Sequence, residues 1–190
     1  MAAAKVPPSL LSSLRRRGEY IMGNSESQIE PSEKIVKLVT GKVPPISVSD
    51  LVDIRDRIYK VIEIKPYNEH TKEHEKSIRW KRTAAQVLDD SYVYEGKSCT
   101  DLVVLFLALC HALNLETRFV KLKKERMVHS VAEIKLEDGW YIIDVSHKDS
   151  VPLKGEVTDE NPYKDWNLWK KGRDAWDLNL VDFESIKKIK

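Results

Sequence analysis

The chain has 190 residues, a length that predicts one domain and is ample for a buried hydrophobic core. Its composition, 42% hydrophobic and 33% charged, is typical of a soluble globular protein, and no transmembrane segment is visible in it. The 32 basic and 30 acidic residues leave a net charge of +2, so we expect neither nucleic acid nor a membrane as a partner.

Residues 1–31 are rich in serine, proline, glycine and charge, which predicts a flexible N-terminal arm. Residues 1–14 contain two prolines and no continuous apolar stretch, so they do not resemble a signal peptide. The two cysteines, Cys99 and Cys110, are eleven residues apart on one predicted helix, which is about 16 Å and too far for a disulfide. Reduced thiols without a signal peptide favour a cytoplasmic protein.

The folded domain is expected over residues 32–190 and begins with two predicted helices. Ser32 is a candidate N-cap for a first helix that Gly41 would end. After a pair of prolines, Ser49 is expected to cap an amphipathic helix over residues 50–62, in which apolar residues recur every three to four positions.

His70 and His74 have the His-x-x-x-His spacing that places two imidazoles on one helix face, as in zinc sites. No glutamate directly follows the first histidine, and the sequence offers no third ligand. We therefore favour a solvated, charged helix or loop here and expect no metal ion.

Residues 96–113 carry the strongest signal in the chain. Residues 102–109 are apolar on every side, which predicts a central helix that is buried all round and too short to cross a membrane. Ser98 and Asp101 have the spacing of a capping box, which places Cys99 at the first helical position. Free backbone amides and the positive end of the helix dipole stabilise a thiolate there, so Cys99 is a candidate nucleophile.

Strands are expected after the central helix. Residues 117–123 alternate as a strand, and the runs around His129 and Asp144 are rich in β-branched and aromatic residues, with Glu-Asp-Gly between them as a turn. The last two runs therefore predict a β-hairpin. A cysteine at a helix N-terminus, followed by histidine and aspartate on successive strands, is the order that a Cys-His-Asp site needs.

The predicted hairpin conflicts with this triad if its turn is tight. A two-residue turn at Asp138 and Gly139 would leave His129 and Asp144 on one face of the sheet but four residues apart, about 13 Å and too far for a hydrogen bond. We therefore expect a wider or bulged loop over residues 134–139 that brings the two side chains together.

The motifs resemble those of the transglutaminase-like superfamily of papain-type thiol enzymes. The similar features are residues 96–101 before an apolar helix, a His-x-x-x-Glu strand and a Gly-Trp-x-x-x-Asp strand, and they span a predicted core at residues 81–146. The resemblance implies an α+β, papain-like fold in which N-terminal helices and a central helix pack on an antiparallel sheet. It also implies that Cys99 is the nucleophile, His129 the general base and Asp144 its orienter.

The same resemblance implies acyl transfer from an amide bond of a peptide or protein through a thioester, with no cofactor. The Cys99 amide would be one oxyanion donor, and Gln86 and Trp80 are candidates for the second. Many relatives have an aromatic residue two positions after the histidine, where this chain has Val131. Without that aromatic wall for an amine acceptor, we favour a hydrolase, either a protease or an amidase. A protein-glutamine transglutaminase and a catalytically silent peptide-binding domain are the alternatives.

Residues 147–190 hold Tyr163, Trp166, Trp169 and Trp176 in a polar and mostly irregular context. Such an aromatic cluster usually packs a loop-rich segment onto its domain, and carbohydrate or peptide binding is the alternative.

Overall fold

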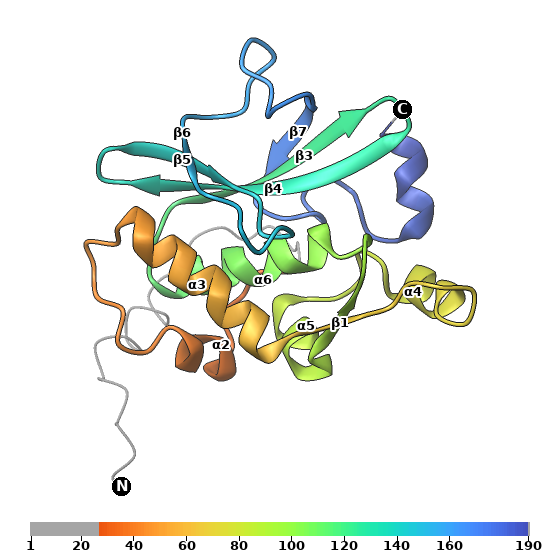
Figure 1. Cartoon of the computed structure of the whole chain (residues 1–190), viewed down its shortest axis with the longest axis horizontal. Coiled ribbons are helices and arrows are strands. Elements are labelled where there is room, and N and C mark those ends of the chain that lie inside the picture. The colour runs from red at the N-terminus through yellow and green to blue at the C-terminus, as the bar shows by residue number, and fades with distance from the viewer. Residues whose placement is uncertain (1–26, 190) are drawn as a thin grey trace, which may run out of the picture.

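A computed structural model describes residues 27–189 as a layer of helices packed against one face of an antiparallel sheet (Figure 1). The helices come first in the chain and most of the sheet follows the central helix, so the predicted α+β architecture is confirmed. Residues 1–26, which make up most of the expected N-terminal arm, and residue 190 lie outside the described residues.

The helices are short apart from two. They are α2 (Glu33–Leu38), α3 (Val48–Val61), α4 (Lys72–Ile78), α5 (Ala84–Asp90), α6 (Cys99–Ala112) and a closing 3-10 helix, η1 (Phe183–Lys188). Within residues 27–189, no helix is both long and apolar enough to cross a membrane.

The N-caps of the first two helices differ in how well the sequence predicts them. Ser32 caps α2 as expected, by accepting a hydrogen bond from a backbone N–H of the first turn. The cap of α3 is Ser47 rather than Ser49, because Ser47 and Asp50 form a reciprocal capping box. The helix therefore begins two residues earlier than predicted.

The main sheet has the strand order β6-β5-β4-β3-β7, with all neighbours antiparallel. Its strands are β3 (Thr117–Lys124), β4 (Met127–Leu136), β5 (Gly139–Ile143), β6 (Leu153–Lys154) and β7 (Asn167–Gly172), and a separate parallel pair joins β1 (Glu63–Lys65) to β2 (Tyr92–Tyr94). Both edge strands come from residues 147–190, which are otherwise irregular up to η1, so the expectation of a mostly irregular segment is confirmed, although the two strands in it were not predicted. Edge strands show little apolar alternation, because solvent reaches one side of them.

α6 is the centre of the hydrophobic core. It packs against β3 and β4 on one side and against α2, α3 and α5 on the other (Figure 1). Every residue of α6 except Cys99 and His111 is buried. The predicted burial of the central helix on all sides is therefore confirmed.

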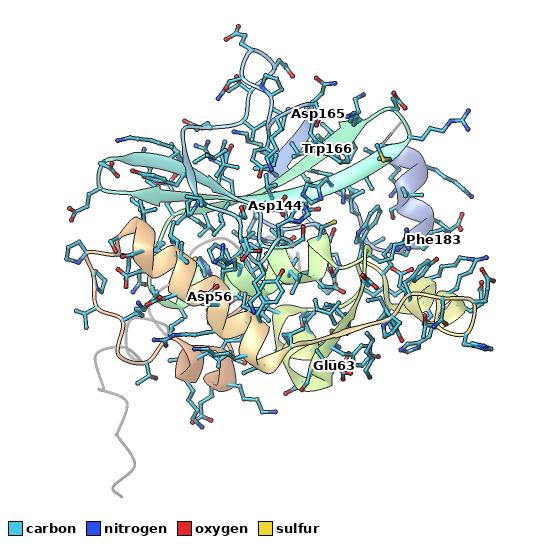
Figure 2. The ribbon with its side chains drawn as sticks, viewed as in Figure 1. Asp56, Glu63, Asp144, Asp165, Trp166 and Phe183 are labelled. Carbon is cyan, nitrogen blue, oxygen red and sulfur yellow. The ribbon has the colours of Figure 1, made fainter. Side chains whose placement is uncertain are left out.

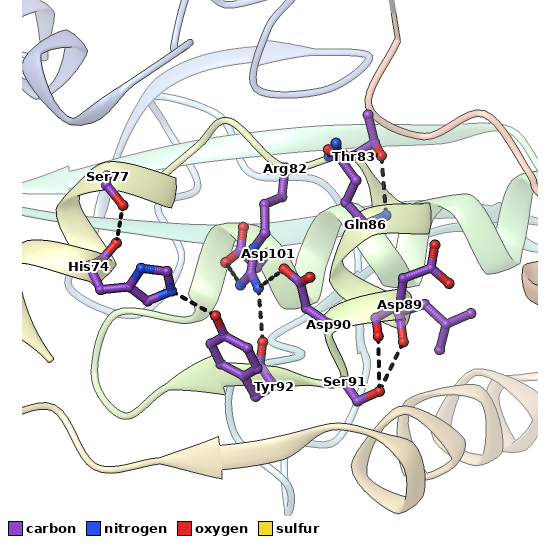
Figure 3. Close-up of polar contacts among 11 residues, drawn as sticks. His74, Ser77, Arg82, Thr83, Gln86, Asp89, Asp90, Ser91, Tyr92 and Asp101 are labelled. Carbon is purple, nitrogen blue, oxygen red and sulfur yellow. Dashed lines mark hydrogen bonds and ion pairs between the residues drawn. The ribbon is translucent and has the colours of Figure 1, made fainter.

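The N-terminus of α6 is stabilised differently from the prediction. Ser98 forms no side-chain cap, and Asp101 does not reach back to it. Instead, Asp101 Oδ2 accepts a 2.6 Å hydrogen bond from Arg82 Nη2, and Arg82 Nη1 also donates to Asp90 and to the carbonyl of Tyr92 (Figure 3). The predicted capping box is wrong because a buried carboxylate gains more from a guanidinium than from one backbone amide.

The described residues before α2 belong to the folded domain. Gln28 is 1% exposed, and its Nε2 donates to the carbonyls of Trp80 at 3.1 Å and Arg82 at 2.9 Å. Its Oε1 accepts from the backbone N–H groups of Ala175 at 3.1 Å and Trp176 at 3.2 Å. One side chain thus joins both ends of the described chain to the segment before α5, and the expected arm over residues 1–31 extends too far.

Replacing Gln28 with alanine tests this packing. Gln28→Ala leaves two buried carbonyls and two N–H groups without these partners, so we expect the free energy of unfolding to fall by about 2–4 kcal/mol. Urea denaturation followed by circular dichroism measures the change. The matched control is Glu30→Ala at an exposed position of the same segment, with an expected effect within about 0.5 kcal/mol. Equal stability of the two variants would contradict the inference.

Candidate active site

Cys99 is the first residue of α6, and its side chain is partly exposed. Gly96, with a φ of +65°, directs the chain into the helix in a left-handed conformation that glycine adopts without strain. The backbone N–H groups of the first turn have no intrahelical partners, so they favour negative charge on this thiol. Cys110, in contrast, is buried in the interior of the same helix.

The β4–β5 hairpin decides whether the predicted histidine and aspartate can meet. Leu136 pairs with Gly139, so Glu137 and Asp138 form a two-residue turn. Glu133 then pairs with Ile142. This register differs by two residues from that of a turn at Asp138 and Gly139.

In this register, Asp144 lies two residues from His129 along the hairpin rather than four, a separation of about 7 Å between backbones that two side chains can bridge. The expected wide or bulged loop is therefore wrong. A tight turn and a His129–Asp144 contact coexist, because the turn begins one residue earlier than predicted.

His129 and Asp144 form a direct hydrogen bond. Nε2 of His129 lies 2.7 Å from Oδ2 of Asp144, whose side chain is 3% exposed. The other carboxylate oxygen accepts from the backbone N–H of Ser146 at 3.1 Å and from its hydroxyl at 2.7 Å. Both oxygens therefore have partners, which fixes the orientation of the carboxylate toward the imidazole.

The imidazole of His129 also interacts with the thiol of Cys99. Since Nε2 is bonded to Asp144, Nδ1 is the ring nitrogen that is available to the thiol. Burial by itself would raise the pKa of Cys99, but the hydrogen bond from His129, the positive charge of Lys121 and a contact with Ser130 lower it to about 6. Burial would likewise lower the pKa of His129, but its bonds to Asp144 and Cys99 raise it to about 9.

The order of these two pKa values is the reverse of that in the free side chains, because the pKa of Cys99 now lies below that of His129. Between about pH 6 and pH 9, Cys99 is a thiolate and His129 an imidazolium. The arrangement therefore offers a nucleophile and a proton donor in contact, which is the combination that acyl transfer requires.

The sequence matches the family model of the transglutaminase-like superfamily over residues 35–145, which include Cys99, His129 and Asp144. The chain belongs to the transglutaminase-like superfamily. No curated protein matches the sequence.

Among solved structures, this transglutaminase-like chain is similar to the "Putative Cysteine Protease from Cytophaga hutchinsonii". The two share 21% sequence identity with a TM-score of 0.51, and the match covers 80% of this chain and 48% of that one. The likeness supports the papain-like, transglutaminase-like fold. The chain thus spans about half the length of that protein.

The two candidate oxyanion donors have different surroundings. Gln86 is exposed, and its Oε1 accepts a 2.9 Å hydrogen bond from the N–H of Thr83 in the capping box of α5 (Figure 3). Its amide is thereby engaged in stabilising that helix. Trp80 is 3% exposed, and its ring lies 4.6 Å from Nζ of Lys121, which hydrogen bonds to the residue following Cys99. Of the two, Trp80 is the one that lies within the cluster around the thiol.

Sequence reasoning missed two aromatic neighbours of His129. The ring of Trp166 lies 5.3 Å from that of His129 at an interplanar angle of 37°, and the ring of His147 lies 6.3 Å away. Figure 2 labels Trp166 together with Asp144. A tryptophan in a polar segment indicates that its ring packs somewhere, but nothing in the sequence shows that it packs on this histidine.

The remaining candidates lie elsewhere. Val131 is fully buried in a second apolar cluster, on the face of the sheet that Val157 and Tyr163 cover. His74 hydrogen bonds to the hydroxyl of Tyr92 at 2.8 Å (Figure 3). No group of three or more His, Cys, Asp or Glu side chains that could hold a metal ion occurs within the described part of the chain.

The two cysteines are expected to differ sharply in reactivity. Iodoacetamide at pH 7 should alkylate Cys99 rapidly because it is a thiolate above about pH 6, whereas burial raises the pKa of Cys110 and blocks access to it. Mass spectrometry of the native protein should show one adduct, and denaturant should expose the second site. A Cys99→Ser variant is the control and should remain unmodified while folded. Equal labelling of both cysteines in the native protein would contradict this assignment.

Proposed function

We propose that this transglutaminase-like protein is a cysteine-dependent hydrolase of amide bonds in peptides or proteins. The observation that carries the proposal is the 2.7 Å contact between Nε2 of His129 and Oδ2 of Asp144. The imidazole of His129 in turn lowers the pKa of the Cys99 thiol. The name of the similar solved structure, a cysteine protease, agrees with hydrolysis, although that name belongs to the other protein.

Acylation would begin with attack of the Cys99 thiolate on the amide carbonyl carbon, which forms a C–S bond and a tetrahedral oxyanion. The Cys99 backbone N–H can donate to this oxyanion, and the indole N–H of Trp80 is our candidate for a second donor. His129 then gives its proton to the leaving nitrogen, the C–N bond breaks, and a thioester remains on the enzyme. Asp144 would hold the imidazole ring in place and stabilise its charged form.

Deacylation would reverse the proton transfers. The neutral imidazole of His129 takes a proton from a water molecule as the water oxygen attacks the thioester carbonyl. The C–S bond breaks, the carboxylic acid leaves, and the thiolate and imidazolium are restored. The two half-reactions need no metal or cofactor.

A second candidate function is transfer of the acyl group to an amine. The sequence favours water because Val131 stands where relatives have an aromatic residue. Trp166 lies against His129, so an aromatic wall is present from another part of the chain. Exclusion of water by this ring would favour an amine acceptor, and a direct comparison of the two acceptors must decide.

The rate of hydrolysis should have a bell-shaped dependence on pH. Activity should rise through about pH 6 as Cys99 ionises and fall through about pH 9 as His129 loses its proton. His129→Ala should lower kcat by about a hundredfold to ten-thousandfold. Asp144→Asn should lower kcat and move the alkaline limb to lower pH, because the carboxylate raises the pKa of His129.

The controls are His70→Ala and Asp149→Asn, which change an exposed histidine and an exposed aspartate. Both should retain the wild-type profile. Full activity of a folded His129→Ala variant would remove this residue from the mechanism. Normal alkylation of Cys99 together with no turnover of any peptide, amine or glycopeptide substrate would favour the silent binding domain.

The acceptor can be measured by partitioning of the thioester. Wild-type protein is incubated with a peptide library and, separately, with a glutamine-containing peptide, each with a primary amine at millimolar concentration, and products are followed by mass. We expect hydrolysis to exceed amine incorporation. Incorporation in excess of hydrolysis would reverse this choice of acceptor and leave the roles of Cys99, His129 and Asp144 unchanged.

A further inference from the structure

Lys121 occupies an unusual position for a lysine. It lies in β3 with its side chain fully buried, on the face of the sheet that carries the core residue Phe119. Its Nζ donates to Ser130 Oγ at 3.0 Å and to Thr100 Oγ1 at 3.3 Å, and it lies 4.6 Å from the ring of Trp80. A lysine at a core position breaks the apolar pattern of its strand, and such exceptions concentrate at functional sites.

The immediate partners of Lys121 are neutral. None of the carboxylates in residues 27–189 forms an ion pair with it, and the two hydroxyls supply only partial charges. A buried ammonium without a counter-charge is strongly unfavourable, so a negative group nearby is needed to balance it. The anion that its environment offers is the thiolate of Cys99.

A short chain of contacts joins the ammonium to the thiolate. Cys99 Sγ lies 3.9 Å from Ser130 Oγ, and this hydroxyl lies 3.0 Å from both Lys121 Nζ and Thr100 Oγ1. Ser130 follows His129 in β4, and Thr100 follows Cys99 in α6. The two residues that would perform the chemistry are therefore each adjacent in sequence to a ligand of the Lys121 ammonium.

We propose that Lys121 is a positioning residue of the site, whose buried ammonium holds Cys99 in its charged form through the hydroxyls of Ser130 and Thr100. The inference rests on the proposed function, since it concerns the same nucleophile. It adds a residue of β3 to the site formed by Cys99, His129 and Asp144. Burial lowers the pKa of Lys121 to about 8, which agrees with a cation that depends on a nearby anion to stay charged.

Other charged groups near Lys121 do not replace this interaction. Arg79 is a second cation, which opposes the charge of Lys121 and forms its own ion pair with Glu75. Asp101 of α6 is paired with Arg82. Across the sheet, the β7 residue that pairs with Lys121 is Lys170, which is exposed.

His129 is the remaining charged group, and it faces the same thiol from β4. Two cations, His129 and Lys121, therefore act on one thiolate. The test must separate their effects, so it changes Lys121 and keeps His129.

The test measures ionisation of Cys99 without any substrate. Wild-type, Lys121→Met and Lys123→Met proteins are alkylated with iodoacetamide between pH 5 and pH 10, and the rate at Cys99 is followed by mass. Lys123 is the matched control, two residues along the same strand, with a partly exposed side chain. The midpoint is the pH at which the alkylation rate of Cys99 is half its maximum. We expect this midpoint to be the same in the wild-type and Lys123→Met proteins. The midpoint of Lys121→Met should rise by at least about one pH unit, which lowers its alkylation rate at pH 6.5 by about threefold or more.

Each outcome supports or overturns the proposal. An unchanged midpoint in a Lys121→Met protein that circular dichroism shows to be folded would reduce Lys121 to a structural role and overturn it. If that variant does not fold, Ser130→Ala decides, because it removes the hydroxyl shared by Lys121 and Cys99. Its midpoint must rise as well, and an unchanged value would overturn the proposal.

The readout also separates this proposal from the proposed function. A raised midpoint in Lys121→Met together with no hydrolysis by the wild-type protein would contradict the hydrolase and leave the role of Lys121 intact. Hydrolysis by the wild-type protein together with an unchanged midpoint in Lys121→Met would contradict the role of Lys121 and leave the proposed hydrolase intact.

Discussion

The burial of α6 on every side is the constraint on which the rest of the structure depends. An apolar helix of 14 residues must be covered by other elements all round, and here β3 and β4 cover one side while α2, α3 and α5 cover the other. The helix therefore has little freedom to shift or rotate. Its first residue, Cys99, therefore has a fixed position at the start of the helix, so a site built on it is held by a helix that is buried on every side.

The second determinant is the register of the β4–β5 hairpin. Register in a hairpin is set by the turn, and a shift of two residues keeps side chains on the same face while moving them about 7 Å along the strand. The turn at Glu137 and Asp138 brings His129 and Asp144 to 2.7 Å. A turn one residue later would leave the same side chains on the same face without contact. A site of this kind thus depends on a turn that lies far from the chemistry.

The charges around the thiol form a balanced set. The thiolate of Cys99 and the carboxylate of Asp144 are opposed by the imidazolium of His129 and the ammonium of Lys121. In a buried environment an unbalanced charge is far more costly than a neutral cluster, so each group stabilises the charged form of its neighbours. Covalent modification of the thiol would remove one of the two negative charges. In the proposed acyl-enzyme, His129 is also neutral because its proton has left with the amine, so Asp144 and Lys121 remain as one negative and one positive charge and the set stays balanced.

The sequence by itself determined the features that rest on local patterns. The apolar run of residues 102–109 predicted the buried helix, Cys99 was predicted at its first position, and the motifs around His129 and Asp144 predicted two successive strands in a transglutaminase-like, α+β fold. These inferences succeed because helix and strand periodicity, and the order of motifs, are written in neighbouring residues. The membership of the family is confirmed, and the catalytic roles stay a prediction.

Only the tertiary structure decided which distant groups meet. Asp101 pairs with Arg82 rather than with Ser98, the C-terminal segment supplies both edges of the sheet, and Trp166 packs on His129 from 37 residues away. The packing of β3 on α6 likewise positions Lys121 near the thiol, where its Nζ donates to Thr100 of α6. Such contacts depend on strand order and on competition between partners for one buried polar group, and neither is encoded in the local periodicity of a chain.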